Sequence, residues 1–246
     1  MIAENLNRAA RDAGVATSVA QFENVGTQAQ YRRAYAIASE TIKAGDRVLD
    51  WGCGNGHFSF FLQSLGAIVT GYSYEPFPAC MAGSTSFTFV PGLGGDARTL
   101  PFADASFDAV VGVGVLEHVT ELGGDERASL SELARVLVRG GSLLTFHLPN
   151  RDGWIETTIR GLRLNRHTHQ RRFDAGEIRA LWSEAGFSVS KLGRYNALPR
   201  NELRALPGAM RHNPAFVRAY DLIDGTITRI APRVCTNWFV VAQKTH

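Results

Sequence analysis

Cysteine, lysine and long apolar runs are all scarce in this sequence of 246 residues. Its three cysteines, Cys53, Cys80 and Cys235, have unrelated spacings, which excludes a disulfide framework and a CxxC metal site. No stretch approaches the roughly 18 consecutive apolar residues of a membrane-spanning helix. The polar first residues also lack the apolar segment of a secretory signal. Together these absences predict a cytoplasmic protein without a transmembrane segment.

Positive charge is carried almost entirely by arginine, with 23 arginines against 3 lysines and a net charge of only +3. A net charge this small does not indicate nucleic-acid binding by itself. Six arginines against two acids lie between Arg151 and Arg172, close to Trp154 and Ile155. This mixture would suit an anionic or amphipathic small-molecule substrate, or peripheral contact with an anionic membrane surface. A solvated amphipathic face would have the same composition, so both interpretations stay open.

Short apolar segments alternate with amphipathic ones along most of the chain. Strands are predicted at residues 47–50, 67–72, 87–90, 107–113, 142–148, 187–192 and 238–242. Helices are predicted between them at residues 57–65, 126–138 and 175–185. Strands that alternate with helices of this length predict an α/β fold with a parallel sheet and crossover helices.

The strongest local signal is the sequence VLDWGCGNG, residues 48–56, where a predicted strand enters a glycine-rich turn before a helix. Glycines let a backbone approach a ligand closely, and the start of a helix offers free N–H groups. The spacing differs from the dinucleotide fingerprint GxGxxG, because position 57 is histidine and the third glycine is Gly56. An acid, Asp50, precedes the first glycine, Gly52, by two residues.

This GxGxG turn with its preceding acid resembles motif I of the class I S-adenosylmethionine-dependent methyltransferases. Further matches follow in the family's order at GDARTLPF (95–102), SFD (106–108), LEHV (116–119), RGG (139–141) and EAGF (184–187). Within the family the chain is most similar to the small-molecule branch typified by ubiquinone and menaquinone biosynthesis methyltransferases. The resemblance implies a Rossmann-like, doubly wound sheet of about seven mostly parallel strands with an antiparallel last strand. It also implies S-adenosylmethionine as the cofactor.

On this resemblance the whole chain, 1–246, is expected to form one methyltransferase domain. Residues 1–44 would form an N-terminal helical cap, and residues 45–150 the half that binds the cofactor. Residues 151–246 would form the substrate side, with long inserted connections at 151–174 and 198–233. Connections of this length in a compact domain are often functional.

The resemblance also implies which residues contact the cofactor. Asp50 would balance the cationic methionine end, and Gly52 and Gly54 would let the loop pass against the methionine and the ribose. Asp96 and Ala97 would meet the adenine, since a carboxylate accepts from the exocyclic amine and a backbone N–H donates to the ring.

The end of the second predicted strand departs from the family's pattern. The family usually places there an acid that bridges the ribose hydroxyls, and this chain has Ser73, with the acid two residues later at Glu75. Either Ser73 makes a weaker hydrogen bond or Glu75 reaches back. Tyr74 would stack on the adenine, and Val113, at the end of the fourth predicted strand, would lie beside the methionine moiety.

Methyl transfer is an in-line displacement at carbon, so an enzyme mainly supplies proximity and alignment. A weakly acidic hydroxyl acceptor also needs a base. The candidate catalytic bases are His118, which follows the fourth predicted strand, and His169, in the arginine-rich connection. His147 lies inside an apolar strand, where a core histidine is the better interpretation. No cluster of histidine, cysteine and aspartate has metal-ligand spacing, so no metal site is predicted.

The leading hypothesis is therefore an enzyme that methylates a small organic acceptor at a hydroxyl oxygen. Methylation at nitrogen or carbon is an alternative that needs no base. A non-catalytic domain that keeps the fold is another, which Ser73 favours and the intact glycine turn disfavours. A nucleic-acid partner is disfavoured, because the chain has no Asn/Asp-Pro-Pro-aromatic tetrad and no basic appendage.

Overall fold

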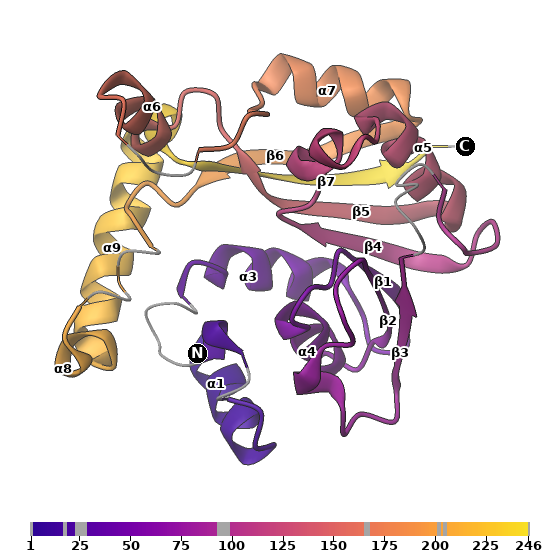
Figure 1. The fold of residues 1–246 in the computed structure, drawn as a ribbon, viewed down its shortest axis with the longest axis horizontal. Helices are drawn as coiled ribbons and strands as arrows, with labels where there is room; N and C mark the ends of the chain where they lie inside the picture. Colours follow the sequence, from indigo (N-terminus) through magenta and orange to yellow (C-terminus); the bar gives the residue numbers. More distant parts are fainter. Residues whose placement is uncertain are drawn as a thin grey trace.

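The computed structural model describes residues 2–16, 19–22, 29–92, 99–164, 168–200, 203 and 206–245. Seven strands within these ranges form one sheet in the order β3-β2-β1-β4-β5-β7-β6 (Figure 1). The strands are β1 (Arg47–Trp51), β2 (Ile68–Ser73), β3 (Phe87–Pro91), β4 (Phe107–Val113), β5 (Leu137–Pro149), β6 (Phe187–Tyr195) and β7 (Asn237–Lys244). The last strand, β7, lies antiparallel between β5 and β6, and the pairs among β1 to β5 are parallel. The predicted Rossmann-like sheet is confirmed.

Helices cover both faces of this sheet, as Figure 1 shows. One face carries α1 (Ile2–Asp12), α3 (Arg32–Thr41) and α4 (His57–Ser64). The other face carries α5 (Glu126–Val136) and α7 (Ala175–Glu184). Three further helices lie past the end of the sheet at which β5 stops: α6 (Trp154–Gly161), α8 (Gly208–Arg211) and α9 (Pro214–Ile230). Every helix among the described residues is too short or too polar to cross a bilayer.

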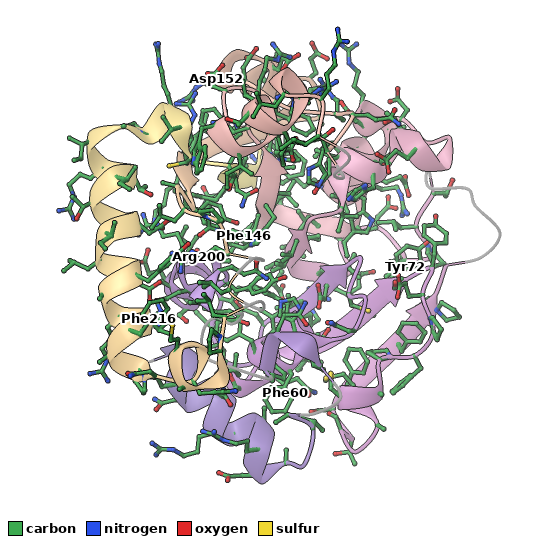
Figure 2. All side chains as sticks on the ribbon, turned by 60° about the vertical axis from the view of Figure 1, so that its left-hand side comes forward. Phe60, Tyr72, Phe146, Asp152, Arg200 and Phe216 are labelled. Carbon is green, nitrogen blue, oxygen red and sulfur yellow. The ribbon has the colours of Figure 1, made fainter. Side chains whose placement is uncertain are left out.

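Each face of the sheet buries its own apolar cluster. Tyr35, Phe58 and Phe146 are fully buried under the helices of the first face, and Leu130 and Trp182 under those of the second. Figure 2 shows side chains filling the space between sheet and helices, with Phe146 near the middle. Strands buried on both faces are near-continuous apolar runs. This explains why the central strands could be recognised in the sequence.

The start of β5 differs from the prediction. The sequence indicated a helix to residue 138 and a strand from 142, whereas α5 ends at Val136 and β5 begins at Leu137. Leu137 pairs with Phe107 of β4, and the register then shifts before Ser142 pairs with Ala109. The glycine pair at 140 and 141 permits this irregularity, because Gly140 has a φ of +74°.

Candidate active site

The glycine turn between β1 and α4 requires its glycines. Gly52 and Gly56 have φ values of +74° and +80°, in the left-handed region that other residues avoid. A Cβ atom on Gly52 would lie 2.4 Å from Cγ2 of Val115, and one on Gly56 would lie 2.8 Å from Sγ of Cys80. Gly54 also has a positive φ, of +47°. The backbone is therefore bare and tightly turned where the cofactor is expected, and this cradle fits a ligand that approaches the main chain closely.

Asp50 lies beneath this turn rather than in an open cleft. Its side chain is buried, and Oδ2 accepts a hydrogen bond of 2.5 Å from Oγ of Ser59 in α4. Burial raises the pKa of Asp50 to about 6. The carboxyl group thus joins the end of β1 to the first turns of α4, and its contact with the methionine end stays a prediction.

At the end of β2, Ser73 is buried whereas the two residues that follow it are exposed. Ser73 is buried, and its Oγ accepts a hydrogen bond of 3.0 Å from the backbone N–H of Glu75. Tyr74 and Glu75 are exposed, and the ring of Tyr74 packs so closely on Gly92 that a Cβ atom there would lie 2.5 Å from it. Ser73 therefore holds the turn that follows the strand. Which of these side chains meets the ribose or the adenine remains a prediction.

The other predicted cofactor residues divide between described and undescribed parts of the chain. Val113 ends β4 and is half-buried, and the N–H of the next residue, Gly114, donates to the carbonyl of Phe146 at 3.0 Å. Asp96 and Ala97, which are predicted to contact the adenine, lie outside the described residues.

A cavity of about 510 Å³ opens at the ends of β4 and β5, and we call it the acceptor cleft. Gly114 and His147 line it from the sheet side, and Tyr31 lines it from the segment before α3. Ile155 and Ile159 of α6 supply apolar walls. Ligands of open α/β sheets bind at the carboxyl ends of the strands, which is where this cavity lies.

The two predicted bases, His118 and His169, come together in the acceptor cleft. Their ring centroids are 5.5 Å apart. Nδ1 of His118 lies 2.8 Å from Oε2 of Glu121, and Nδ1 of His169 lies 2.5 Å from Oε1 of Glu156. Because an ionised carboxylate only accepts, it holds the hydrogen on Nδ1 and leaves the lone pair of the neutral ring on Nε2. The hydrogen bond with Glu156 also raises the pKa of His169.

Glu117 was missed as a functional candidate by the sequence analysis. It is 2% exposed, its Oε2 has no hydrogen-bond partner, and burial raises its pKa to about 7. Glu117, His118 and His169 each offer a ligating atom, and these atoms lie within 4.8 Å of one another. The spacing rules had indicated no metal cluster, and the fold nevertheless brings these three together. The available signal was that Glu117 directly precedes His118.

His147 is not the ordinary core residue that its strand suggested. It sits at a register shift between β5 and β7 with a φ of +62°, and its N–H donates to Oη of Tyr195 at 2.8 Å. Its ring stacks on Tyr31 at 4.8 Å between centroids, and burial lowers its pKa to about 4. His147 therefore forms a neutral, aromatic wall of the acceptor cleft.

Two arginines of the 151–172 connection, Arg151 and Arg171, are bound to acids. Nη1 of Arg151 lies 2.6 Å from Oδ2 of Asp174, and Nε of Arg171 lies 2.6 Å from Oε1 of Glu126. Arg171 also stacks over the ring of Phe173 at 4.4 Å. These contacts fasten the connection to α5 and to the start of α7. The positive charge of these two arginines is thus offset within the protein.

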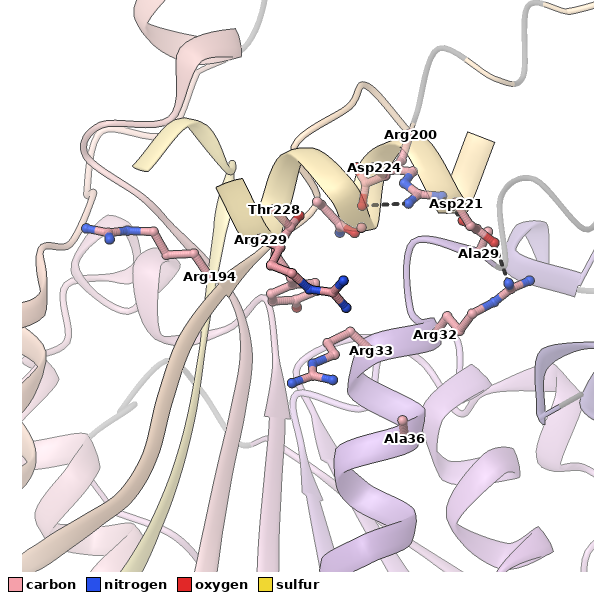
Figure 3. Close-up of a pocket in the computed structure, with 13 residues that line it drawn as sticks. Ala29, Arg32, Arg33, Ala36, Arg194, Arg200, Asp221, Asp224, Thr228 and Arg229 are labelled. Atoms are coloured by element: carbon pink, nitrogen blue, oxygen red, sulfur yellow. Dashed lines mark hydrogen bonds and ion pairs between the residues drawn. The ribbon is translucent and has the colours of Figure 1, made fainter. Parts of the chain in front are cut away.

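A second hollow, of about 430 Å³, lies between α3 and α9 (Figure 3). Arg200 bonds Asp221 at 2.6 Å and Asp224 at 2.9 Å, and Arg32 pairs with the same Asp221. Arg200 also lines the acceptor cleft, so the two hollows share a wall. This ion-pair group fixes α9 against the segment that closes one side of the cleft.

Comparison with known proteins agrees with this architecture. Residues 49–145 match the family model described as a methyltransferase domain. A probable S-adenosylmethionine-dependent methyltransferase of Mycolicibacterium smegmatis is 32% identical over 72% of this chain and 63% of its own length. A demethylmenaquinone methyltransferase of a Mycobacterium species is 37% identical over 48% of each chain. The chain thus spans less than two thirds of the length of these curated relatives.

Solved structures share the fold of this chain. The S-adenosylmethionine-dependent methyltransferase of Archaeoglobus fulgidus superposes with a TM-score of 0.58 over 86% of this chain and 93% of its own, at 18% identity. The sheet order, the glycine turn after β1 and the match over 49–145 agree with one another. This chain therefore belongs to the class I S-adenosylmethionine-dependent methyltransferases, the family that its glycine turn resembles.

Proposed function

We propose that this chain transfers a methyl group from S-adenosylmethionine to a hydroxyl oxygen of a small organic acceptor bound in the acceptor cleft. The observation that carries the proposal is the meeting of His118 and His169, each bonded to a carboxylate, in a cavity beside Gly114. A hydroxyl must lose its proton as it becomes an ether, and an imidazole held by a carboxylate can take up that proton.

The cofactor, when bound, supplies a methyl group on a sulfonium whose departing thioether is neutral. The chain's own residues hold it: the bare turn at Gly52 and Gly54 admits it, and Ser73 and Tyr74 meet the ribose and the adenine. Asp50 offsets the positive charge of the methionine end. This assignment places the transferred group near Val113 and Gly114, at the mouth of the acceptor cleft. Asp96 and Ala97 would complete the adenine contact.

The walls of the acceptor cleft support a small amphipathic acceptor. Ile155, Ile159 and Leu198 are apolar, whereas the histidines and Arg200 are polar. Because Arg200 is already paired with two aspartates, a neutral or singly anionic acceptor suits the cleft better than a highly charged one. Such mixed walls hold an apolar body and orient one polar group.

Contact with a membrane surface is a further part of this proposal. Leu162 and Leu164, just after α6, are 66% and 48% exposed, and the exposed side chains of Arg160 and Arg163 lie beside them in the sequence. Exposed apolar side chains among arginines favour adsorption to an anionic bilayer. An amphipathic acceptor could then reach the cleft from the membrane.

Two alternatives predict different products. Methylation at nitrogen or carbon would not need the paired histidines, and a non-catalytic domain would not need the cleft. Two imidazole rings, each bonded to a carboxylate, meet in the acceptor cleft. They favour a hydroxyl acceptor over both alternatives, because they provide a base beside the place where the methyl acceptor would bind.

The test is incubation of the purified chain with S-adenosylmethionine labelled with ¹³C at the methyl group and a metabolite extract of the source cell. Mass analysis should reveal one or a few labelled products, and the ¹³C chemical shift should be that of a methoxy group. A His169→Asn variant is the matched control and should label the same product far more slowly. An N-methyl or C-methyl shift would overturn the oxygen assignment, and the absence of any labelled product would favour the non-catalytic alternative.

A further inference from the structure

The cluster of Glu117, His118 and His169 has the composition of a metal site. Glu117 and His118 are neighbours on the 3-10 turn Leu116–His118, and His169 comes from the connection between α6 and α7. Their ligating atoms lie within 4.8 Å of one another. Ligands about 2.1 Å from a tetrahedral cation are about 3.4 Å apart, so small side-chain rotations would close the set around an ion.

The surroundings of the two histidines are those of metal ligands. Nδ1 of His118 bonds Glu121, and Nδ1 of His169 bonds Glu156. Histidines that ligate metals almost always donate their second ring nitrogen to a carboxylate, a carbonyl or water, which fixes the tautomer and orients the ring. Here both rings have that partner, and in both the lone pair of the neutral ring is on Nε2.

The charge of the cluster also calls for a cation. Glu117 is 2% exposed and its Oε2 has no hydrogen-bond partner. Within the described part of the chain, no arginine or lysine forms an ion pair with Glu117. Three carboxylates, those of Glu117, Glu121 and Glu156, thus surround two imidazoles, and a buried carboxylate without a partner is costly. A divalent ion would supply the missing partner and balance the local charge.

We propose that Glu117, His118 and His169 bind a divalent first-row transition-metal ion whose open coordination position faces the acceptor cleft. Two imidazole nitrogens and one carboxylate favour Zn²⁺, Mn²⁺ or Fe²⁺ over Mg²⁺ and Ca²⁺, which prefer oxygen ligands. Three protein ligands leave at least one position for an exogenous oxygen. The cavity of about 510 Å³ beside them has room for its carrier.

The catalytic consequence of this ion rests on the proposed function. A hydroxyl oxygen bound to the cation has a lowered pKa and releases its proton to solvent water. That oxygen forms a bond to the methyl carbon while the carbon–sulfur bond breaks, and the electron pair of that bond stays on sulfur. The histidines then act as ligands, and the cation does the work of the base.

The binding test uses the full chain, stripped with EDTA and dialysed, with neither cofactor nor acceptor present. Calorimetric titration with Mn²⁺ should give one site per chain, and Mg²⁺ should bind at least about 100-fold more weakly. Mn²⁺ avoids the competing thiols of the three cysteines, whose burial raises their pKa values. Absence of a Mn²⁺ site, or equal binding of Mg²⁺, would overturn the proposal.

Variants assign the site to these residues. Glu117→Gln and His169→Asn should each weaken Mn²⁺ binding at least about 100-fold, and Glu156→Gln, which acts through His169, about 10–100-fold. The matched control is His212→Asn, because His212 is exposed at the end of α8 and does not line the cleft. Full binding by both ligand variants, or its loss in the control, would contradict the assignment.

A spectroscopic measurement on the unaltered chain keeps the proposal testable if a variant fails to fold. With one equivalent of Cu²⁺ as probe, pulsed electron paramagnetic resonance should detect coupling to two histidine rings, and no such coupling would overturn the site. Measuring methyl transfer distinguishes the metal proposal from the proposed function. Activity that persists without any bound ion refutes the catalytic role of the metal and leaves the proposed function intact. An ion bound as predicted in a chain that transfers no methyl group refutes the function alone.

Discussion

The hydroxyl of Ser59 donates a hydrogen bond of 2.5 Å to Oδ2 of Asp50, and this bond joins the end of β1 to α4 beneath the glycine turn. Both residues are buried. The bond favours the ionised carboxylate, but burial disfavours it more, and the pKa of Asp50 rises to about 6. The apo protein therefore holds, near neutral pH, a negative charge that its own structure compensates incompletely.

The first prediction concerns stability. Because folding raises the pKa of Asp50 from 3.8 to about 6, its contribution is full below about pH 3 and is lost as the pH rises through 6. This carboxyl group should lower the free energy of unfolding by about 3 kcal/mol between about pH 3 and pH 8. Asp50→Asn keeps an acceptor for Ser59 and should lack that decline. Urea unfolding of both proteins at several pH values measures the difference, and parallel pH dependences would contradict the prediction.

The second prediction concerns cofactor affinity. If the ionised Asp50 offsets the cationic methionine end, S-adenosylmethionine should bind more weakly as the pH falls below about 6, by up to about tenfold per pH unit. Asp50→Asn should bind weakly at every pH and show no such dependence. Calorimetry from pH 5 to 8 tests this, and Ser59→Ala, which keeps the carboxylate but removes a bond that lowers its pKa, should move the pH dependence upward. If binding by the unaltered chain does not depend on pH, the assignment of Asp50 to the cofactor site is wrong.

The third prediction distinguishes Ser73 from Glu75. Ser73 is buried at the end of β2 and holds the turn, whereas Glu75 is exposed. Ser73→Asp should keep or tighten cofactor binding, because the new carboxylate can still accept from the N–H of Glu75 and can reach a ribose hydroxyl. Glu75→Ala should change the dissociation constant little. A loss of about 1–3 kcal/mol of binding free energy for Glu75→Ala alone would show that Glu75 makes the ribose contact.

The fourth prediction concerns the acceptor proton. His169→Asn should lower kcat by about 10²–10⁴-fold, since it removes either the base or a ligand of the cation that replaces it. The KM for S-adenosylmethionine should change little, because His169 lines the acceptor cleft and not the glycine turn. His212→Asn is again the control. Full activity in His169→Asn would leave His118 as the proton acceptor or indicate a reaction without a base.

The fifth prediction concerns Arg171 in the arginine-rich connection. Arg171 bonds both oxygens of Glu126, at 2.6 and 2.9 Å, and is 27% exposed. Arg171→Gln should therefore destabilise the fold by about 1–3 kcal/mol and leave the acceptor KM nearly unchanged. Thermal unfolding and steady-state kinetics separate the two effects. An acceptor KM that rises with salt in the unaltered chain, and that is already raised and depends less on salt in this variant, would instead indicate that Arg171 attracts an anion.

The fold could be predicted from the sequence where local patterns decide the structure. Central strands are apolar because both faces of the sheet are covered, and Gly52 and Gly56 are required by the left-handed backbone of the turn. The early start of β5 could not be predicted, because it depends on the pairing of Leu137 with Phe107, a contact between distant segments.

The candidate site could be predicted only in part for the same reason. Glu117 and His169 are far apart in the sequence, and only the path of the connection after α6 brings them together. Spacing rules for metal ligands detect local motifs and could not detect this one. Likewise the pairing of Arg171 with Glu126 depends on where α5 and the connection meet, so charge counting alone suggested an anion-binding rim.

The close contact of Gly52 with Val115 has a consequence for the rigidity of the glycine turn. A Cβ atom at position 52 would lie 2.4 Å from Cγ2 of Val115, so the turn cannot move toward that side chain without displacing it. The turn is therefore held in its shape on this side before any ligand arrives. A preorganised turn of this kind spends little of a ligand's binding free energy on ordering the backbone.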